Sequence, residues 1–395
     1  MAIAVLPSRI EHTVLTVEPS RDLVDGRRVR LGMVGGGEAS FMGAVHRTAV
    51  RLDNHYELVA GALSSMPDEA PRAAHAFGLA RGYADYLTMA REEAARPDGI
   101  EAVSIVAPDN QHARVAEAFL QAGIHVICDR PMMATLAEAQ RLKALAQRSG
   151  RLFAVTQSHA GQAMLRRARR LVREGALGDI RVAQVDYPRD ACPDPTQAAY
   201  DAVHGGTGGG IDDNCILAFD LLHYVTGLGS TELCAPRGAL AAGGGDDANT
   251  QVLLRLANGA HGMLCPSQQQ TPDADSGLRL RVYGSRGTVE WVQEHPDRLC
   301  HAPFGEPVRT ASDVATDVSS DGRRVTRRPG GAPEGFLETF ATLYGDIAQA
   351  IRAARDGAPV PSDVDFPTLD DGIHALAFAD AARRSAADGG CWVRL

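Results

Sequence analysis

Val29-Arg30-Leu31-Gly32-Met33-Val34-Gly35-Gly36-Gly37 is the stretch that decides the fold. Its first six residues are mostly apolar and predict a short buried strand, and three glycines follow at once. The next segment, 44–52, has the composition of a helix. In a strand, glycine turn and helix of this kind, the glycines let backbone amides approach a pyrophosphate at the helix N-terminus. The stretch therefore predicts the dinucleotide-binding turn of a Rossmann domain.

The same alternation continues to about residue 150. Strand-like runs at 56–63, 102–106 and 125–128 are separated by helix-like segments at 68–77, 113–122 and 136–148. Strands that alternate with helices at this spacing indicate a parallel, doubly wound sheet. We predict a dinucleotide-binding domain over residues 29–150, preceded by an N-terminal arm at 1–28 with little core of its own.

Beyond residue 150 the pattern changes. A strand at 153–156 and a basic helix at 164–174 precede five strand-like runs, at 181–187, 250–257, 260–265, 278–283 and 287–292. Tight turns such as Asn258-Gly259 indicate a mostly antiparallel sheet. One helix at 216–226 interrupts the strands, 303–333 reads as a long loop, and helices at 334–355 and 369–387 close the chain. The fold class is therefore α/β, with a second α+β domain over 151–395 that carries an open-faced sheet.

Composition argues against several classes of function. A length of 395 residues favours two domains with a small-molecule cleft between them. The net charge of −9 and the absence of a basic, aromatic-rich run argue against a nucleic-acid partner. No run stays apolar for about 18 residues and the N-terminus has no export signal, so we expect a cytoplasmic protein without a membrane partner. The seven cysteines show no metal-ligand spacing, so we expect reduced thiols and no metal site.

The predicted cofactor site begins at the glycine turn. Gly35, Gly37 and Ser40 occupy the three fingerprint positions, with Glu38 between them, and the small Ser40 is expected to allow close packing of strand on helix. The second strand ends at Ser64, where an acidic residue would bind the ribose of NAD. A serine hydroxyl can bond to either a 2′-hydroxyl or a 2′-phosphate, and Arg72 is the nearest cation. The sequence therefore leaves NAD and NADP open.

Further motifs follow in a specific order: residues 107–112 (Ala-Pro-Asp-Asn-Gln-His), 128–131 (Cys-Asp-Arg-Pro), 208–220, 282–290 and 333–336. Together with the glycine turn they resemble the Gfo/Idh/MocA family of oxidoreductases over nearly the whole chain. The resemblance implies NAD(P)-dependent oxidation or reduction of a sugar, inositol or related polyol on the open face of the second sheet. It implies a homodimer or homotetramer built through that sheet. The implied cofactor contacts on the nicotinamide side are Pro108, Asn110, His112 and Asp129.

Two motifs differ from the family pattern. Family members generally carry Glu-Lys-Pro where this chain has Asp129-Arg130-Pro131, and the lysine is the expected acid/base group. They also carry Asp-x-Gly-x-His-x-x-Asp, which falls on Asp213, Cys215, Leu217 and Asp220. An arginine donates hydrogen bonds but is not deprotonated, so Arg130 can orient a substrate oxygen without carrying its proton. The one lysine of the chain, Lys143, is expected on the surface.

Proton transfer then needs another carrier. On a helix that starts near Asp213, residues 213, 217 and 220 share a face, which makes Asp213 the first candidate and Leu217 and Asp220 candidate substrate contacts. The further candidates are His159 and Tyr187 for catalysis and His204 for substrate binding, whereas His223 points away and is expected to be structural. For each of these residues, and for Arg130, a purely structural hydrogen bond or ion pair is the alternative.

Three functions remain open from the sequence. The first is an oxidoreductase with rewired acid/base groups. The second is an enzyme of the same fold that runs a non-redox reaction, such as an elimination or a rearrangement. The third is a non-catalytic binding homologue, which the retained glycines and the two aspartates of the 213–220 motif disfavour.

Overall fold

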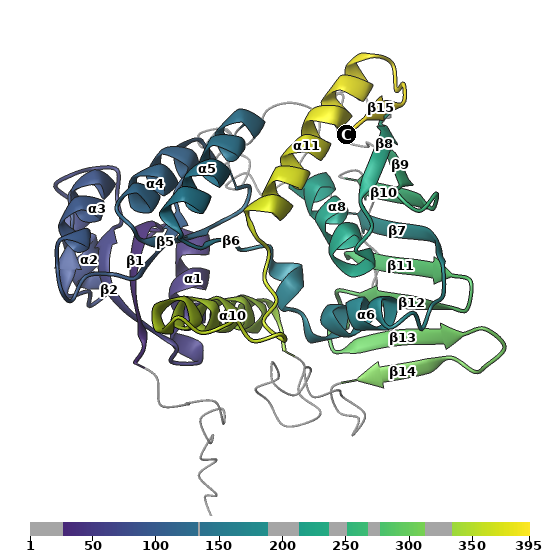
Figure 1. Cartoon of the computed structure of the whole chain (residues 1–395), viewed down its shortest axis with the longest axis horizontal. Coiled ribbons are helices and arrows are strands. Elements are labelled where there is room, and N and C mark those ends of the chain that lie inside the picture. Colours follow the sequence, from purple (N-terminus) through teal and green to yellow (C-terminus); the bar gives the residue numbers. More distant parts are fainter. Residues whose placement is uncertain (1–26, 133–134, 189–212, 237–250, 268–276, 313–333) are drawn as a thin grey trace, which may run out of the picture.

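The computed structural model describes residues 27–132, 135–188, 213–236, 251–267, 277–312 and 334–395 (Figure 1). These residues form two β-sheets, each covered by helices, with the long helices α10 (Phe336–Asp356) and α11 (Leu369–Ala387) near the junction. No helix in these ranges is long and apolar enough to span a bilayer.

The first sheet is the expected parallel one. Its strands are β1 (Val29–Gly35), β2 (Tyr56–Ala62), β3 (Arg81–Gly82), β4 (Ala102–Val106), β5 (His125–Cys128) and β6 (Phe153–Val155). They lie in the order β3-β2-β1-β4-β5-β6, and every neighbouring pair is parallel. From β1 the chain therefore continues to β2 and β3 on one side of the sheet, whereas from β4 it continues to β5 and β6 on the other side. A crevice for a dinucleotide is expected at the carboxyl ends of these two strands.

Helices cover both faces of this sheet. They are α1 (Phe41–Leu52), α2 (Ala70–Ala76), α3 (Tyr86–Ala94), α4 (Asp109–Gln121) and α5 (Leu136–Ser149). One core joins α3, α4 and α5 to the sheet, and another joins α1 and α10 to it. Strands β4 and β5 are buried along their whole length, because helices cover both of their faces.

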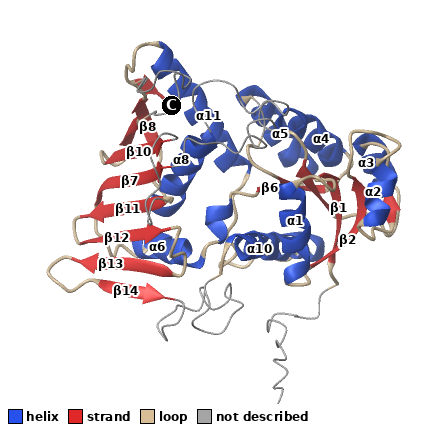
Figure 2. Cartoon of the chain, turned by 180° about the vertical axis from the view of Figure 1, so that it is seen from behind, coloured by secondary structure: helices blue, strands red, loops and turns tan. Residues whose placement is uncertain are grey.

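The second sheet is mixed but mostly antiparallel, in the order β14-β13-β12-β11-β7-β10-β9-β8-β15, and only β7 and β10 run parallel. Its strands are β7 (Ile180–Pro188), β8 (Ser230–Cys234), β9 (Val252–Leu256), β10 (His261–Ser267), β11 (Arg279–Gly284), β12 (Gly287–Val292), β13 (Arg298–Pro303), β14 (Arg309–Ser312) and β15 (Val393–Arg394). Helices α6 (Ala163–Arg173), α8 (Asp213–Thr226) and α11 pack on it through one core (Figure 2).

The structure corrects several expected elements. Strand β6 belongs to the first sheet, so the boundary expected at residue 150 falls too early in the chain. Helix α4 starts at Asp109 rather than at residue 113, because its first turn is polar and escapes an apolar pattern. Strand β14 lies inside the loop expected at 303–333, and β13 precedes it. Strand β14 is a polar edge strand, which gives little apolar alternation to detect.

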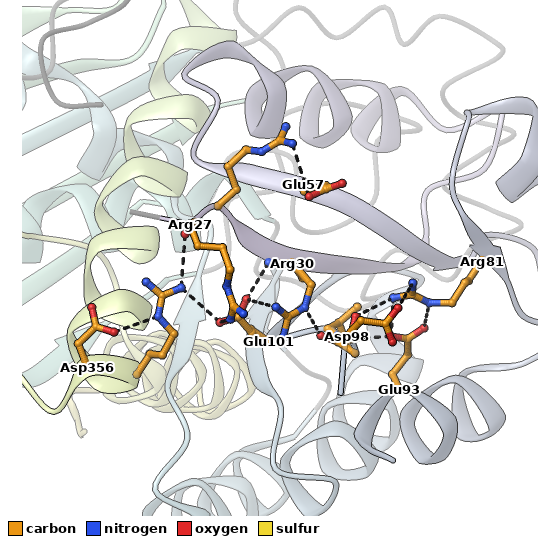
Figure 3. A network of polar contacts seen from close by, with 12 residues as sticks. Arg27, Arg30, Glu57, Arg81, Glu93, Asp98, Glu101 and Asp356 are labelled. Atoms are coloured by element: carbon orange, nitrogen blue, oxygen red, sulfur yellow. Dashed lines mark hydrogen bonds and ion pairs between the residues drawn. The ribbon is translucent and has the colours of Figure 1, made fainter. Parts of the chain in front are cut away.

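An ion-pair network lies near the amino ends of β1 and β4, at the opposite end of β1 from the glycine turn (Figure 3). It includes Arg27, Arg30, Arg81, Glu93, Asp98 and Glu101. Glu93 of α3 is its most buried member, with 1% of its surface exposed. Its carboxylate accepts hydrogen bonds from Arg81 at 2.6 and 2.9 Å, from the Tyr83 hydroxyl at 2.7 Å and from the Ile100 amide at 3.0 Å. Burial raises the pKa of the Glu93 carboxyl, but Arg81 and Tyr83 outweigh that effect and hold it below its ordinary value.

We expect Glu93→Gln to lower the free energy of unfolding by about 3 kcal/mol, because it leaves Arg81 without its buried partner. The stabilisation is present above the unfolded pKa of about 4.3 and is lost as the pH falls through the lower folded value. Urea unfolding of both proteins at pH 7 and at acid pH measures the difference. Glu57→Gln is the control, since the Glu57 pair with Arg28 is exposed and should contribute under about 1 kcal/mol. An equal loss in both variants would contradict the prediction.

Candidate functional site

The glycine turn lies between the carboxyl ends of three strands. Gly35 has a φ of +76°, and a Cβ there would lie 2.5 Å from the carbonyl oxygen of Val106 at the end of β4. A Cβ on Gly37 would lie 2.6 Å from the carbonyl oxygen of Leu63, just after β2. Only glycine fits these positions without displacing backbone. Helix α1 begins directly after the turn, so its first amides form the kind of cradle that binds a pyrophosphate.

Ser40 has a different role from the one expected. Its backbone is extended and its Oγ accepts a hydrogen bond from the Gly43 amide at 3.0 Å, so Ser40 is the N-cap of α1. The close approach between turn and helix occurs at Gly43, where a Cβ would lie 2.3 Å from the carbonyl oxygen of Gly36. Gly43 stands only three residues beyond the fingerprint pattern and is not among the predicted site residues. Glu38, between Gly37 and Ser40, is exposed.

At the end of β2, the Ser64 hydroxyl takes part in a local turn. It accepts a hydrogen bond from the Met66 amide at 3.1 Å and donates one to Glu69 Oε2 at 3.4 Å. Glu69 therefore brings a carboxylate to the place where the sequence pattern has serine. Arg72, on α2, is exposed.

Just beyond β4, Pro108 precedes α4 and Asn110 is exposed in its first turn. His112 is almost fully buried, and its ring joins two loops. Nδ1 lies 2.9 Å from the carbonyl oxygen of Pro131, and Nε2 lies 2.7 Å from that of Ala107. A neutral imidazole can donate to only one of these two oxygens. His112 thus ties the Arg130-Pro131 loop to the end of β4.

Asp129 follows β5 and is largely buried. The Thr156 hydroxyl donates to its Oδ1 at 2.7 Å, and Nε2 of His46 lies 3.4 Å from the same oxygen. Burial alone raises the pKa of this carboxyl, but His46 and Thr156 outweigh burial and lower it. Asp129 is therefore ionised at neutral pH. Neither Thr156 nor His46 carried a signal in the sequence.

Arg130, His159 and Asp220 form a second group of charged and polar side chains. Gln157, which is not among the predicted site residues, donates from Nε2 to Asp220 Oδ2 at 2.7 Å. Burial raises the pKa of Asp220 well above its ordinary value. The positive charge of Arg130 partly opposes this effect, and the nearby Asp371 adds to it. Burial, Arg130 and Arg169 lower the pKa of His159 to about 3. His159 is thus neutral at pH 7.

A polar pocket of about 220 Å³ adjoins this group. Its lining consists of residues from α6, from α8, from Gln157 and from the segment leading into α11: Gln157, Arg169, Asp220, His223, Tyr224, Gly227, Asp365, Phe366, Pro367 and Asp371. Asp220 therefore contacts both the Gln157 amide and a space large enough for several water molecules. In the part of the chain that the structure describes, no group of three or more His, Cys, Asp or Glu side chains could hold a metal ion.

The other predicted residues lie as follows. Helix α8 starts at Asp213, so Asp213, Leu217 and Asp220 stand at the spacing that puts them on one face, although the Asp213 side chain lies outside the described part. Leu217 and Tyr187 are half-buried against the core of the second sheet. His204 lies outside the described residues.

Two residues that were expected to be uninvolved have structural contacts. His223 Nδ1 contacts the Leu228 carbonyl oxygen at 3.0 Å, just beyond the C-terminal end of α8. Lys143 pairs with Asp370 on the surface, and 43% of its side chain is exposed. These contacts agree with the structural role expected for His223 and the surface position expected for Lys143.

Comparisons with known proteins cover both sheets. Residues 29–157 match the model of an oxidoreductase family with an NAD-binding Rossmann fold (GFO/IDH/MocA), and residues 165–290 match the GFO/IDH/MocA C-terminal domain. The uncharacterized oxidoreductase YfiI of Bacillus subtilis is 32% identical over 94% of this chain and 99% of the relative. Inositol 2-dehydrogenase of Rhizobium meliloti is 29% identical over 91% of this chain and 97% of the relative.

Two solved structures also match nearly the whole of this chain. An oxidoreductase from Sinorhizobium meliloti is 43% identical, with a TM-score of 0.83 over 93% of this chain and 100% of the other. An inositol dehydrogenase homologue from Azotobacter vinelandii, complexed with NADH and myo-inositol, is 30% identical, with a TM-score of 0.85 over 94% of this chain and 98% of the other.

Proposed function

Since the chain belongs to the Gfo/Idh/MocA family of oxidoreductases, we propose that it transfers a hydride between NAD and a carbinol carbon of an inositol, a sugar or a related polyol. The observation that carries this proposal is the likeness to the Azotobacter vinelandii homologue, because that protein was solved with NADH and myo-inositol and the match extends over both sheets. The glycine turn supports it, since a side chain at Gly35 or Gly37 would collide with the backbone carbonyl oxygens beside the turn.

We propose NAD rather than NADP as the working cofactor. The Glu69 carboxylate beside Ser64 would repel a 2′-phosphate, whereas a carboxylate accepts hydrogen bonds from a ribose hydroxyl. Arg72, the cation that could have compensated, is exposed on α2.

The acid/base groups are proposed to be rewired. NAD supplies the hydride acceptor when bound, so the residues of this chain must hold the substrate oxygen and remove its proton. Arg130 supplies a fixed positive charge for that oxygen. His159 is a poor base with its pKa near 3, and Tyr187 is half-buried against the core of the second sheet, so we turn to the two aspartates of α8, Asp213 and Asp220. We assign proton transfer to Asp213, because Asp220 is already held by Gln157.

The test is to incubate the protein with NAD⁺ and a panel of inositols, sugars and other polyols, and to follow the absorbance of NADH. We expect NADH to appear in proportion to the substrate consumed. Substrate loss without net NADH would favour instead an elimination or rearrangement on the same fold. The arginine and leucine at the usual lysine and histidine positions are the observation behind that alternative.

We further propose a homodimer or homotetramer built through the outer face of the second sheet. Leu253 of β9 and Met263 of β10 are paired across the two strands, and 41% and 36% of their surfaces are exposed. Buried residues alternate with them along β9, so Leu253 and Met263 face away from the helices. An apolar pair on a sheet face of this size favours coverage by a second copy.

Light scattering at micromolar concentration is expected to give a dimer or a tetramer. The double variant Leu253→Glu, Met263→Glu should shift it to a monomer with unchanged secondary structure, because it introduces like charges at the contact. Leu87→Glu is a matched control, since Leu87 is exposed on α3 of the first sheet. A monomeric wild-type protein would refute the interface.

A further inference from the structure

We propose that a buried chain of three side chains, Ser104, Tyr344 and His46, positions the Asp129 carboxylate for the bound dinucleotide. These are positioning residues: they act on the cofactor through Asp129 and are not expected to touch it. The inference rests on the proposed contact between Asp129 and the nicotinamide half of NAD.

The chain is continuous and comes from four separate elements. The Ser104 hydroxyl of β4 lies 2.7 Å from the Tyr344 hydroxyl of α10. That hydroxyl lies 2.8 Å from Nδ1 of His46, on α1, and Nε2 of His46 lies 3.4 Å from Asp129 Oδ1. The first three side chains are almost completely buried. The last contact is longer than an ordinary hydrogen bond, but Nε2 of His46 has no nearer partner among the described residues.

The carboxylate determines the direction of the contact with His46, and a neutral ring then determines the rest of the chain. Asp129 is ionised and can only accept, so Nε2 of His46 must carry the hydrogen that faces it. In a neutral ring, Nδ1 then accepts from the Tyr344 hydroxyl. Burial raises the pKa of Tyr344, which keeps this hydroxyl protonated. Ser104 can complete the series by donating to the Tyr344 oxygen. A single tautomer of His46 therefore satisfies all three contacts.

The aromatic surroundings hold this arrangement in place. The His46 ring packs edge-on against Phe340 and Tyr344, with ring centroids 5.1 and 5.8 Å apart. The Tyr56 hydroxyl donates to the Tyr344 carbonyl oxygen at 2.9 Å. His46 and Tyr344 are thus fixed relative to each other by packing as well as by hydrogen bonds.

Both donors that reach Asp129 point at the same oxygen. The Thr156 hydroxyl and Nε2 of His46 face Oδ1, whereas Oδ2 receives no hydrogen bond from the described residues. Two donors on one oxygen restrict the rotation of the carboxylate. Asp129 directly follows β5, the strand next to β4, and 10% of its side chain is exposed. Oδ2 is therefore the oxygen that remains available to a dinucleotide bound at the carboxyl ends of these strands.

The experiment is a double-mutant cycle read by NADH binding. His46→Leu and Asp129→Asn should each raise the dissociation constant of NADH about tenfold, as expected for loss of a hydrogen bond to a charged group. The double variant should bind no more weakly than Asp129→Asn, because His46 acts only through that carboxylate. His46→Gln retains an N–H donor and should recover part of the binding. Tyr344→Phe, which keeps the ring and its packing, should weaken binding by about two- to tenfold.

His125→Leu is the matched control. His125 is a buried histidine at the opposite end of β5, and its Nδ1 accepts the Leu152 amide at 2.9 Å. This change is expected to lower the melting temperature and to leave the NADH dissociation constant unchanged.

Additive losses in the double variant, or equal binding by His46→Leu and wild type, would overturn the inference and leave the proposed function standing. A wild-type protein that does not bind NADH would contradict both the inference and the proposed function. Should His46→Leu fail to fold, the Tyr344→Phe and Asp129→Asn pair provides the same cycle.

Discussion

Replacing Asp213 with asparagine is expected to lower kcat by about 10²–10⁴-fold, the range typical of losing a general acid or base. Asparagine is nearly isosteric with aspartate but cannot accept the proton of the substrate hydroxyl. Binding of NADH should not change, because Asp213 is the first residue of α8, in the second half of the chain, and the glycine turn is in the first sheet. Steady-state turnover and a separate NADH titration measure the two effects.

Asp220→Asn is the matched control, seven residues further along the same helix. Burial raises the pKa of Asp220 well above its ordinary value, and the Gln157 amide already holds this carboxyl. We expect a loss at least about tenfold smaller than for Asp213→Asn, with the Gln157 contact as its origin. If Asp213→Asn turned over normally, or if Asp220→Asn were the more damaged variant, proton transfer would have to be reassigned to Asp220.

Arg130→Gln is expected to lower kcat/KM by about 10²–10³-fold, comparable to removing one donor from an oxyanion site. Arg130→Lys should fall between this variant and wild type, because it keeps the charge and loses the planar fork of donors. The positive charge of Arg130 lowers the pKa of both Asp220 and His159, so in Arg130→Gln both values should rise. An NMR titration of the Asp220 carboxyl and the His159 ring in both proteins measures that shift.

Arg91→Lys serves as the control for this series, since Arg91 is exposed on α3 and has no proposed role. Its kinetics should match those of wild type. Higher activity of Arg130→Lys than of wild type on ordinary polyols would mean that arginine has only replaced a catalytic lysine, and the anchoring role would be wrong.

Much of the first sheet could be predicted from the sequence. The glycine turn, the fully apolar β4 and β5 and the helices between them each have a local pattern, because burial on both faces leaves few polar residues in a strand. The expected boundary at residue 150 left β6 outside the first domain, since three apolar residues do not say which neighbouring strand they will pair with. The polar strand β14 was missed for a related reason: it lies at the edge of the sheet formed by the described residues, and a half-covered strand has little apolar alternation.

Part of the candidate site could likewise be predicted from the sequence, and part of it could not. The sequence by itself determined that a glycine turn precedes a helix, that arginine follows Asp129 and that two aspartates stand seven positions apart near the start of α8. These are properties of residues close together in the chain, where spacing alone sets which face they share.

Only the tertiary structure decided which distant residues meet. His46 and Tyr344 are 298 positions apart, and Gln157 and Asp220 are 63 apart, yet each pair is in hydrogen-bond contact. It also decided that Gly43, rather than Ser40, allows the helix to approach the turn. The raised pKa of Asp220 belongs here too, because it follows from burial and from the charges of Arg130 and Asp371. Local periodicity reports the hydrogen bonding and burial of one element, whereas such contacts and pKa values depend on how several elements pack around one point.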